Sequence, residues 1–426
     1  MKIKVINKKY EDVLALPKVK RFKPMKQHLF FRLILRIASS FDLWATHFKC
    51  HKIGMEKLGK KEPCLVLMNH SSFIDLEIVS TVLFPRRFNI VTTSDAFVGL
   101  NWILRLIGCI PTKKFIADTN LIRDMIYAVK ELKSSVVMYP EASYSFDGTA
   151  TPLPDSIGRL VKMLGVPVIS IHTYGAFTRD PLYNGLRKRK VDVSADMKYL
   201  LSSQEIAEKT AAEIQEIVQT EFTFDNFKWQ QDNQISIQED FRAEGLERVL
   251  YKCPQCLAEG EMLGEGSTLS CKHCGKQYEL TEYGYMKANQ GETEYEHIPD
   301  WYYWERTCVR KELEEDTYLL QVPVDICMMV NTKSIYRVGE GVLKHTKDGF
   351  HLSGCDGKLD YYQKPLSSYS LYSDYFWYEI GDVICVGDAN VLYYCFPKDC
   401  GDVVAKTRLA TEELYKMAKR NKKATQ

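Results

Sequence analysis

His70 and Asp75 are a pair of side chains whose types and spacing suit acid–base chemistry. They stand in the run NHSSFID, directly after the apolar run CLVLM. An imidazole accepts a proton near neutral pH and a neighbouring carboxylate fixes its tautomer, so the pair has the parts of a general base. On one regular helix, side chains five positions apart point about 140° apart. We therefore expect His70 in the turn before a helix and Asp75 in its first turn, with Ser71 and Ser72 as candidate N-caps.

Four cysteines further along the chain have the spacing of metal ligands. Cys253 and Cys256 lie in CPQC, and Cys271 and Cys274 lie in CKHC. The pattern C-x2-C-x14-C-x2-C brings four thiolates into one tetrahedron, which is typical of structural Zn²⁺; iron in a similar four-sulfur geometry is the alternative. We expect a zinc ribbon over residues 250–285, without an open coordination position. Because the ribbon lacks a basic or aromatic surface, we expect no nucleic-acid partner.

The elements that must position His70 and Asp75 follow from alternating apolar runs between about residues 60 and 200. Strand-like runs such as SVVMY and VPVISIHTY alternate with amphipathic helical runs such as SIGRLVKML. Such alternation predicts an α/β domain with a buried central mixed sheet and flanking helices. Glu141 follows the SVVMY run, at the end of the strand where α/β sheets place ligands.

The next elements are predicted from local signals. The run RKVDVSADM predicts a strand over residues 189–197, and a single helix is expected over 202–219, opened by a capping box of Ser202 and Glu205. Residues 224–249 are polar and acidic, so we expect a linker there.

The C-terminal part has a different sequence pattern. From about residue 314, short β-like runs are punctuated by Gly, Asp and Asn, and a helical run, DVVAKTRLATEELYKMAKR, follows them. We expect an antiparallel β domain with a C-terminal helix over residues 286–426. The order of elements resembles a pleckstrin-homology-type fold, which would bind a lipid or a partner protein. The aromatic run WYYW at 301–304 is interpreted as a buried anchor between modules, with an interfacial membrane belt as the alternative.

Composition indicates a soluble globular protein of two to three domains. The 426 residues are 45% hydrophobic and 26% charged, with a net charge of +2. No run is suited to span a membrane, because the best candidate, residues 29–45, is interrupted by Arg32, Arg36 and Asp42. That run is typical of an amphipathic helix lying in the bilayer interface; an ordinary core-packing helix is the alternative.

Charge and cysteine usage predict the location. Basic residues gather at both ends of the chain, which favours an anionic membrane surface as a partner over merely solvated tails. Thirteen cysteines without a signal peptide predict reduced thiols or metal ligands in the cytoplasm. We therefore expect a cytoplasmic, peripheral membrane protein.

Four blocks in order resemble the glycerolipid acyltransferase family, typified by 1-acyl-glycerol-3-phosphate acyltransferases. They are NHSSFID, GCIPTKK (108–114), YPEASYS (139–145) and VPVISI (166–171). The resemblance covers roughly residues 40–200. It implies an acyltransferase domain over residues 1–223, with N-terminal amphipathic helices that associate with a membrane. The implied reaction is O-acyl transfer from acyl-CoA or acyl-carrier protein to the hydroxyl of a lysophospholipid or related glycerolipid.

The resemblance also implies roles for individual residues. His70 is the base that takes the acceptor's hydroxyl proton directly, without an acyl-enzyme, and Asp75 orients the imidazole and stabilises the imidazolium. Glu141 helps to build the acceptor and oxyanion region. The expected substrate-binding residues are Asn69, Lys113, Lys114, Ser143, Tyr144 and Arg159.

Several positions depart from the family pattern. Ala142 replaces its glycine and Ser143 its threonine, both mild changes, but Tyr144 replaces an arginine that contacts phosphate. Lys114 matches another family arginine, and Arg159 is a candidate substitute for a missing lysine. The acceptor therefore stays open: lysophosphatidic acid, a bulkier or less charged lysolipid, or another alcohol or amine. A lipid-binding scaffold without turnover is the alternative function, and a zinc-ribbon nucleic-acid protein is a third.

Overall fold

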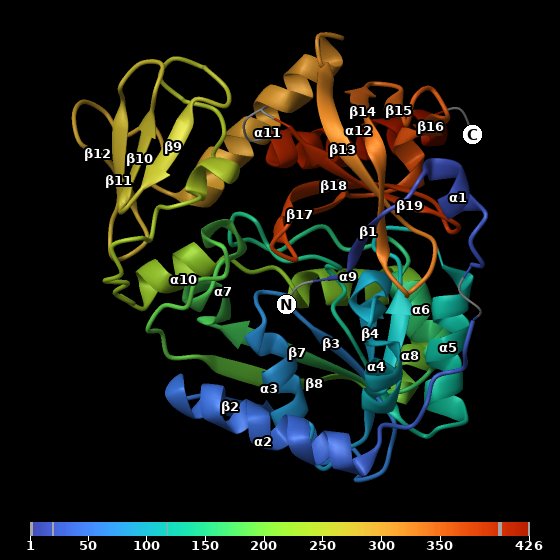
Figure 1. Cartoon of the computed structure of the whole chain (residues 1–426). Coiled ribbons are helices and arrows are strands. Elements are labelled where there is room, and N and C mark those ends of the chain that lie inside the picture. Colours follow the sequence, from blue (N-terminus) through green and yellow to red (C-terminus); the bar gives the residue numbers. More distant parts are fainter. Residues whose placement is uncertain (1–2, 19–20, 117, 399–402, 425–426) are drawn as a thin grey trace.

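The computed structural model describes residues 3–18, 21–116, 118–398 and 403–424 (Figure 1). Its strands form a seven-stranded, a four-stranded and an eight-stranded sheet. In Figure 1 the seven-stranded sheet lies in the lower part of the molecule, the four-stranded sheet at the upper left and the eight-stranded sheet at the upper right. The α/β, four-cysteine and β-rich regions of the sequence thus each contain a sheet of their own.

The seven-stranded sheet has the order β2-β8-β7-β3-β6-β4-β5. Neighbouring strands are parallel except β7 and β8, so the predicted mixed sheet is confirmed. A parallel strand covered on both faces needs a continuous apolar run, and LVLM of β3 is buried at every residue. The strands are β2 (Lys49–Ile53), β3 (Leu65–Met68), β4 (Phe88–Thr93), β5 (Cys109–Thr112), β6 (Ser135–Met138), β7 (Val168–Tyr174) and β8 (Ser194–Leu201).

Helices cover both faces of this sheet. On one face Ile74 and Ile78 pack in one apolar cluster with Val66, and on the other Val161 packs with Leu65. The alternation along β3 follows from the two-residue period of a strand. The helices of this region are α2 (Leu29–Ala45), α3 (Ile74–Val82), α4 (Asn101–Ile107), α5 (Thr119–Lys130), α6 (Ile157–Leu164), α7 (Ala176–Arg179), α8 (Ser203–Glu208) and α9 (Ala211–Glu221).

Two predicted elements differ from the structure. The strand expected over 189–197 is β8, which begins only at Ser194 and continues to Leu201. The single helix expected over 202–219 is two helices: the predicted capping box of Ser202 is confirmed, but Lys209 is extended and Thr210 opens α9 with a second capping box. A second N-cap within the run interrupts the helix although the apolar period continues.

The segment expected to be an acidic linker, residues 224–249, is packed. It contains α10 (Asn226–Asp232) and a 3-10 turn at Leu246–Arg248, and Phe227 and Leu246 are buried. Arg242 Nε donates to the carbonyl oxygen of Leu280 in the four-stranded sheet at 2.5 Å. Scattered apolar residues in this polar sequence are therefore enough to fix it against its neighbours.

The four-stranded sheet is antiparallel, in the order β12-β11-β10-β9, and it extends to Ala288, three residues beyond the predicted limit of the ribbon. Its strands are β9 (Met262–Glu265), β10 (Thr268–Cys271), β11 (Gln277–Leu280) and β12 (Met286–Ala288).

Helix α11 (Ile298–Glu314) follows this sheet and carries the aromatic run. Trp301 is fully buried, donates from Nε1 to the carbonyl oxygen of Lys252 at 3.0 Å, and lies edge-on to Tyr278 at 4.9 Å. The predicted buried anchor is confirmed for Trp301 and Tyr302, whereas Tyr303 is 61% exposed.

The eight-stranded sheet confirms the predicted antiparallel β region followed by a helix. Its seven C-terminal strands are antiparallel, in the order β16-β15-β14-β13-β19-β18-β17. The likeness to a pleckstrin-homology-type fold stays a prediction. The elements are β13 (Leu320–Met329), β14 (Ile335–Thr346), β15 (Gly349–Gly354), β16 (Leu359–Gln363), β17 (Tyr372–Trp377), β18 (Gly381–Gly387), β19 (Leu392–Pro397) and α12 (Val403–Ala424).

The N-terminal residues join this C-terminal sheet. Strand β1 (Val5–Asn7) pairs in parallel with β14 from Ile335 to Arg337, and α1 (Tyr10–Leu14) follows it. Tyr10 Oη lies 3.3 Å from Tyr393 Oη. Residues that the sequence assigns to the acyltransferase region therefore complete the β-rich region.

Helix α2 has the predicted bounds and packs against α3. One of its two arginines, Arg32, is 9% exposed and donates to the carbonyl oxygen of Pro85, so it faces the protein. In the part of the chain that the structure describes, no helix is long and apolar enough to cross a membrane. The remaining face of α2 is apolar and exposed, at Phe30, Leu33, Ile34, Ile37, Phe41 and Trp44.

Candidate active site

His70 and Asp75 meet as the sequence predicts. His70 lies in the loop after β3, Asp75 is the second residue of α3, and His70 Nδ1 is 3.1 Å from Asp75 Oδ2. The predicted serine caps are wrong, since no side chain caps this helix. The backbone N–H groups of Ser71 and Ser72 instead donate to Asp75 Oδ2, at 2.8 and 3.0 Å. One carboxylate thus fixes both the turn and the imidazole.

The bond to Asp75 leaves His70 Nε2 as the nitrogen that can accept a proton. His70 lines a cavity of about 1700 Å³, and 18% of its side chain is exposed. Burial lowers the pKa of His70 from its usual 6.5, and the hydrogen bond to Asp75 opposes part of this shift. The imidazole is therefore neutral near pH 7, with Nδ1–H donating to Asp75, which is the form a general base needs.

Two tyrosine rings enclose the His70 ring. The Tyr139 ring lies 4.1 Å from it with the planes at 20°, and the Tyr144 ring lies 4.2 Å away at 38°. Tyr144 stands where the resemblance implies a phosphate-contacting arginine, and it supplies an aromatic face to His70 in place of a fork of N–H donors. Stacking on both faces restricts the tilt of the imidazole.

Glu141 lies behind His70 and holds two backbone segments. Its Oε2 accepts from the backbone N–H of His70 at 2.8 Å, and its Oε1 accepts from that of Thr151 at 2.9 Å. Burial raises the pKa of Glu141 to about 7. Glu141 is not among the residues that line the large cavity. Its carboxylate therefore acts on the site through the position of His70.

Ala142 adopts a left-handed backbone conformation, with φ at +58°. A side chain in this conformation costs roughly 1–2 kcal/mol relative to glycine. The glycine-to-alanine change, which the sequence suggests to be mild, is therefore a strained one. It lies between Glu141 and the buried Ser143, in the loop that carries Tyr144.

Two predicted substrate-binding residues do not line the cavity. Asn69 is buried; its Oδ1 accepts from the backbone N–H of Thr173 at 2.8 Å, and its Nδ2 donates to Ser71 Oγ at 3.1 Å. Asn69 thus ties the end of β3 to the end of β7. Ser143 is also buried, and its Oγ accepts from Arg408 Nη2 of α12 at 3.1 Å.

The three predicted cations line the cavity together with His70. Lys113 Nζ donates to the carbonyl oxygens of Asp388 and Ala389, at 3.3 and 2.5 Å. Lys114 Nζ lies 4.6 Å from the centre of the Tyr372 ring. Arg159 lies on α6. The structure thus brings six predicted site residues to one cavity: His70, Asp75, Lys113, Lys114, Tyr144 and Arg159.

One wall of the cavity was not predicted from the sequence. Tyr372, Asp374, Phe376 and Trp377 of β17 line it, although they lie in the β-rich region. Tyr372 Oη donates to Asp95 of the α/β region, which fixes β17 over the site. The available signal was the run SYSLYSDYFWYEIG, in which two carboxylates, Asp374 and Glu379, stand among many aromatic residues.

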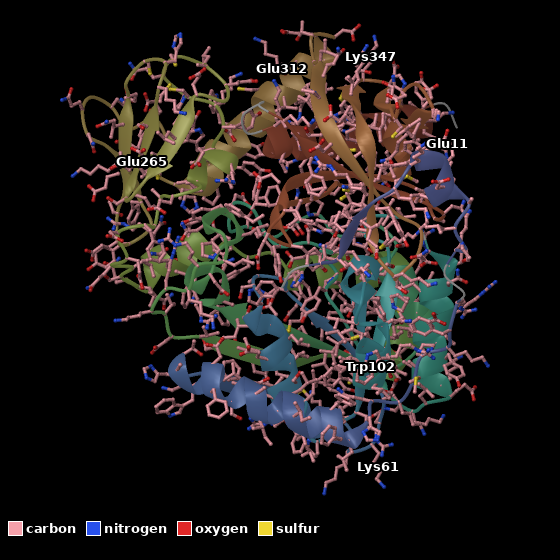
Figure 2. The ribbon with its side chains drawn as sticks, in the orientation of Figure 1. Glu11, Lys61, Trp102, Glu265, Glu312 and Lys347 are labelled. Atoms are coloured by element: carbon pink, nitrogen blue, oxygen red, sulfur yellow. The ribbon has the colours of Figure 1, made fainter. Side chains whose placement is uncertain are left out.

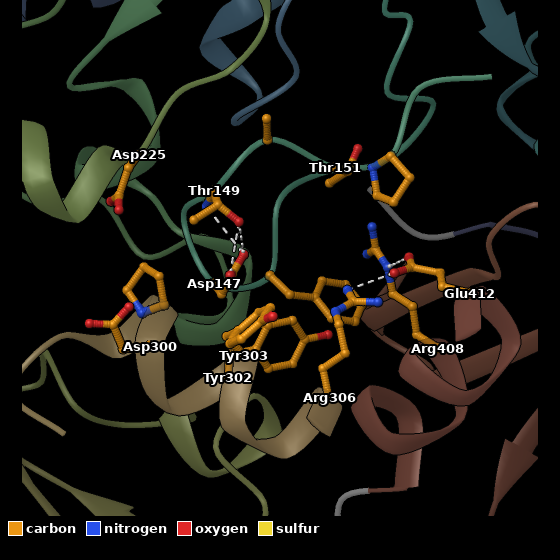
Figure 3. Close-up of a pocket in the computed structure, with 14 residues that line it drawn as sticks. Asp147, Thr149, Thr151, Asp225, Asp300, Tyr302, Tyr303, Arg306, Arg408 and Glu412 are labelled. Carbon is orange, nitrogen blue, oxygen red and sulfur yellow. Dashed lines mark hydrogen bonds and ion pairs between the residues drawn. The ribbon is translucent and has the colours of Figure 1, made fainter. Parts of the chain in front are cut away.

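A smaller cavity of about 320 Å³ lies at the loop from Asp147 to Thr151, between that loop, α11 and α12 (Figure 3). Arg408 Nε donates to Glu412 Oε1 at 3.3 Å, and Arg306 Nη2 lies 2.7 Å from Glu412 Oε2. Because Arg408 also donates to Ser143, these ion pairs tie α11 and α12 to the active-site loop.

The four cysteines come together as predicted. Their ligand atoms all lie within 4.8 Å of one another, and the Cys253–Cys274 and Cys256–Cys271 Sγ distances are both 3.7 Å. Four sulfurs at the tetrahedral Zn–S distance lie roughly 3.8 Å apart, so the geometry fits a four-thiolate metal site. His273, between the last two cysteines, is not a member of this cluster.

Part of this sequence is similar to known proteins. Residues 49–173, which contain His70, Asp75 and Glu141, match the family model described as Acyltransferase. The 1-acyl-sn-glycerol-3-phosphate acyltransferase BAT2, chloroplastic, of Brassica napus is 26% identical over 152 residues, which are 34% of this chain and 43% of that protein. The corresponding LPAT1, chloroplastic, of Arabidopsis thaliana is 24% identical over 169 residues, or 38% of this chain and 46% of that protein.

A crystal structure of the 1-acyl-sn-glycerophosphate acyltransferase PlsC from Thermotoga maritima aligns with a TM-score of 0.37 and 15% identity, over 45% of this chain and 78% of that one. The chain spans less than half the length of the two plant relatives. Residues 174–426, with the ribbon and the β-rich region, lie outside the family match.

Proposed function

Residues 49–173 belong to the glycerolipid acyltransferase family, and on this premise we propose that the chain transfers a fatty acyl group to the hydroxyl of a lysophospholipid or related glycerolipid. The donor is an acyl thioester, either acyl-CoA or acyl-carrier protein. The observation that carries the proposal is His70: its Nδ1 is held by buried Asp75, and its ring lines a large cavity.

In the proposed reaction one group, His70, both accepts a proton and returns it. His70 Nε2 takes the hydroxyl proton while the acceptor oxygen attacks the thioester carbonyl, forming a C–O bond and a tetrahedral oxyanion. The oxyanion collapses, the C–S bond breaks, and the imidazolium returns the proton to the leaving thiolate. Asp75 stabilises the imidazolium that exists between these two transfers.

Glu141 and the cavity cations have supporting roles in this proposal. Glu141 is a positioning residue, because its carboxylate holds the backbone of His70 and Thr151. Lys114 and Arg159 are the cations offered to phosphate groups of the two substrates. Lys113, whose ammonium group already donates to two carbonyl oxygens of the β18–β19 turn, joins that turn to the site.

The acceptor is a membrane lipid, and α2 offers a surface for a membrane. The exposed apolar residues of α2 recur on one side of the helix, and Trp44 is 81% exposed. Figure 2 shows exposed Trp102 and Lys61 in the lower part of the molecule, the part in which α2 lies. We propose peripheral association, with this face in the interface of an anionic bilayer.

We also propose that the four cysteines hold a structural Zn²⁺. The donor set is four thiolates with no ligand position left for a substrate. The metal would then stabilise the ribbon, and no step of acyl transfer would pass through it.

The test is acyl transfer by the purified chain. Labelled acyl-CoA and acyl-carrier protein are each incubated with a panel of lysolipids, using the wild type, His70→Ala and the control His51→Ala. His51 is exposed, and its Nδ1 lies 3.2 Å from Asp196 Oδ1 at the sheet edge. Loss of a general base costs roughly 10²–10⁴-fold in rate. We therefore expect a decrease of this size in the acyl-transfer rate of His70→Ala but not in that of His51→Ala.

The same experiment separates catalysis from a lipid-binding scaffold. Tyr144, in place of the family arginine, is the observation that favours the scaffold. Vesicle or lysolipid binding without His70-dependent transfer to any acceptor would establish the scaffold and reject the enzyme.

A further inference from the structure

The charged side chains of the active-site cavity differ in how well the protein pairs them. Asp95 accepts from Tyr372 Oη and Trp377 Nε1, and Asp155 pairs with Lys419. Asp75 is occupied by His70 and two backbone N–H groups. Among the described residues, Asp374 has no ion pair within 4.0 Å, although it lines the same cavity.

The cations of the cavity also differ in whether they have a hydrogen-bond or ion-pair partner. Lys113 and Lys162 donate to backbone carbonyl oxygens, and Lys419 pairs with Asp155. For Lys114, within the described ranges, the structure gives no hydrogen bond or ion pair, only the face of the Tyr372 ring. Asp374 accepts from the backbone N–H of Tyr375, and the charge of Lys114 acts on its carboxylate. Among the described residues, Lys114 and Asp374 are therefore a cation and an anion that both line the cavity and that have no ion pair within 4.0 Å.

Strand β17 fixes the spacing of these two groups. Tyr372 and Asp374 are two residues apart on the strand, so their side chains share a face roughly 7 Å apart. Lys114 lies over Tyr372, which places a positive and a negative group side by side on one wall. Burial raises the pKa of Asp374 to about 6, so the carboxylate is charged at neutral pH.

This pair of charges distinguishes between phosphate head groups. A phosphomonoester carries about −1.5 to −2 at pH 7 and favours an arginine fork, but Tyr144 stands at the family's arginine position and Asp374 repels a second negative charge. A phosphodiester carries a single charge, which Lys114 can match. An ammonium group attached to that phosphodiester would then meet Asp374, with the aromatic rings of Phe376 and Tyr378 nearby in the lining.

Resting on the proposed acyl transfer, we propose that Asp374 and Lys114 form a head-group subsite that selects a zwitterionic lysophospholipid, one whose phosphodiester carries an amine, as the acceptor. Asp374 binds the ammonium group and Lys114 binds the phosphate. The β-rich region thereby supplies the specificity of a reaction whose base lies in the α/β region.

The test compares four acceptors that separate phosphate charge from the amine. They are lysophosphatidylethanolamine, lysophosphatidylcholine, lysophosphatidylglycerol, which is a phosphodiester without an amine, and lysophosphatidic acid, which is a phosphomonoester. Asp374→Asn is expected to lower kcat/KM for the two amine-bearing acceptors roughly 10–100-fold, the worth of a charged hydrogen bond, mainly through KM. The value for lysophosphatidylglycerol should stay within about twofold.

A matched control and a binding measurement complete the test. Asp360→Asn removes a carboxylate of the same sheet that is 64% exposed and paired with His351. This variant should leave kcat/KM unchanged for all four acceptors. In a His70→Ala background, which does not turn over, Asp374→Asn should weaken calorimetric binding of lysophosphatidylethanolamine and leave that of lysophosphatidylglycerol unchanged.

Each outcome decides one of the two proposals. If transfer is absent but the Asp374-dependent binding difference is present, the acyltransferase proposal fails and the subsite stands. If transfer occurs but Asp374→Asn affects all four acceptors equally, or the wild type prefers lysophosphatidic acid, the subsite is rejected while the enzyme stands. Lys114→Gln should lower kcat/KM for all four acceptors, because each carries a phosphate.

Discussion

At the scale of single residues, the ionisation of His70 sets the pH range of the proposed reaction. In that proposal the neutral imidazole is the base, and burial lowers the pKa of His70 below its usual 6.5. As pH falls through the folded pKa, the base is protonated and kcat/KM declines. We therefore expect the acid limb of the kcat/KM profile to lie below pH 6.5, as measured with the preferred acceptor.

Two variants check this assignment. Asp75→Asn removes the group that raises the pKa of His70, so the limb should move to lower pH while the rate falls. Glu141, whose pKa is about 7, titrates nearby, and Glu141→Gln removes that ionisation. An acid limb above pH 6.5 that persists in Glu141→Gln would contradict a neutral His70 as the base.

The residue contacts that could be predicted from the sequence are the local ones. His70 and Asp75 are five positions apart, so the turn between them decides whether they meet. Asp374 could not be assigned, because nothing local indicates that β17 lies over His70. The strain at Ala142 was also hidden, since alanine usually adopts helical or extended backbone and only the folded loop requires a positive φ.

At the scale of elements, α2 is the proposed site of contact with a membrane. Phe41 and Trp44 are 74% and 81% exposed on its apolar face. Replacing both by serine removes aromatic surface that would be buried in the interface, worth roughly 1.5–3 kcal/mol for each side chain if fully buried. We expect binding to anionic vesicles in a sedimentation assay to fall at least tenfold.

The control for α2 is Tyr303→Ser. Tyr303 is an exposed aromatic residue of α11, 61% exposed, and lies on a different helix. Its loss should leave vesicle binding unchanged. Equal binding by the wild type and the α2 double variant would show that the apolar face does not contact the bilayer.

Element boundaries followed from the sequence where one local signal acted alone. The bounds of α2 were predicted because its apolar run is continuous and well delimited. The division of residues 202–219 into α8 and α9 was missed, because a second capping box, at Thr210, lies inside a run that keeps a helical period. Residues 224–249 looked like a linker because their composition is polar, whereas a few buried side chains fix them.

At the scale of the whole molecule, the four-cysteine site joins the α/β region to the β-rich region. Trp301 of α11 packs edge-on against Tyr278 in the ribbon sheet. We expect one equivalent of zinc per chain by elemental analysis. Its removal by a chelator should loosen the ribbon and expose Trp301, because structural zinc contributes directly to folding. A red shift of tryptophan fluorescence would report this change.

Cys271→Ser tests the same site by mutation, and it should retain less than half an equivalent of metal. Cys308→Ser, a half-buried cysteine of α11 outside the cluster, is the control and should keep the full equivalent. Less than about half an equivalent of zinc or iron in the wild type would count against the site. The cluster was predictable because its spacing is local; the attachment of the ribbon to α11 was not.

The pairing of β1 with β14 bears on the order in which the site is completed during synthesis. Val5 leaves the ribosome before its partner Ile335, which emerges only after the α/β sheet and the ribbon. Closing so long a loop is slow, and N-terminal domains tend to fold first. A nascent chain therefore holds the His70–Asp75 pair before β17 exists to cover it, so the cavity closes only after residues 372–377 have been made.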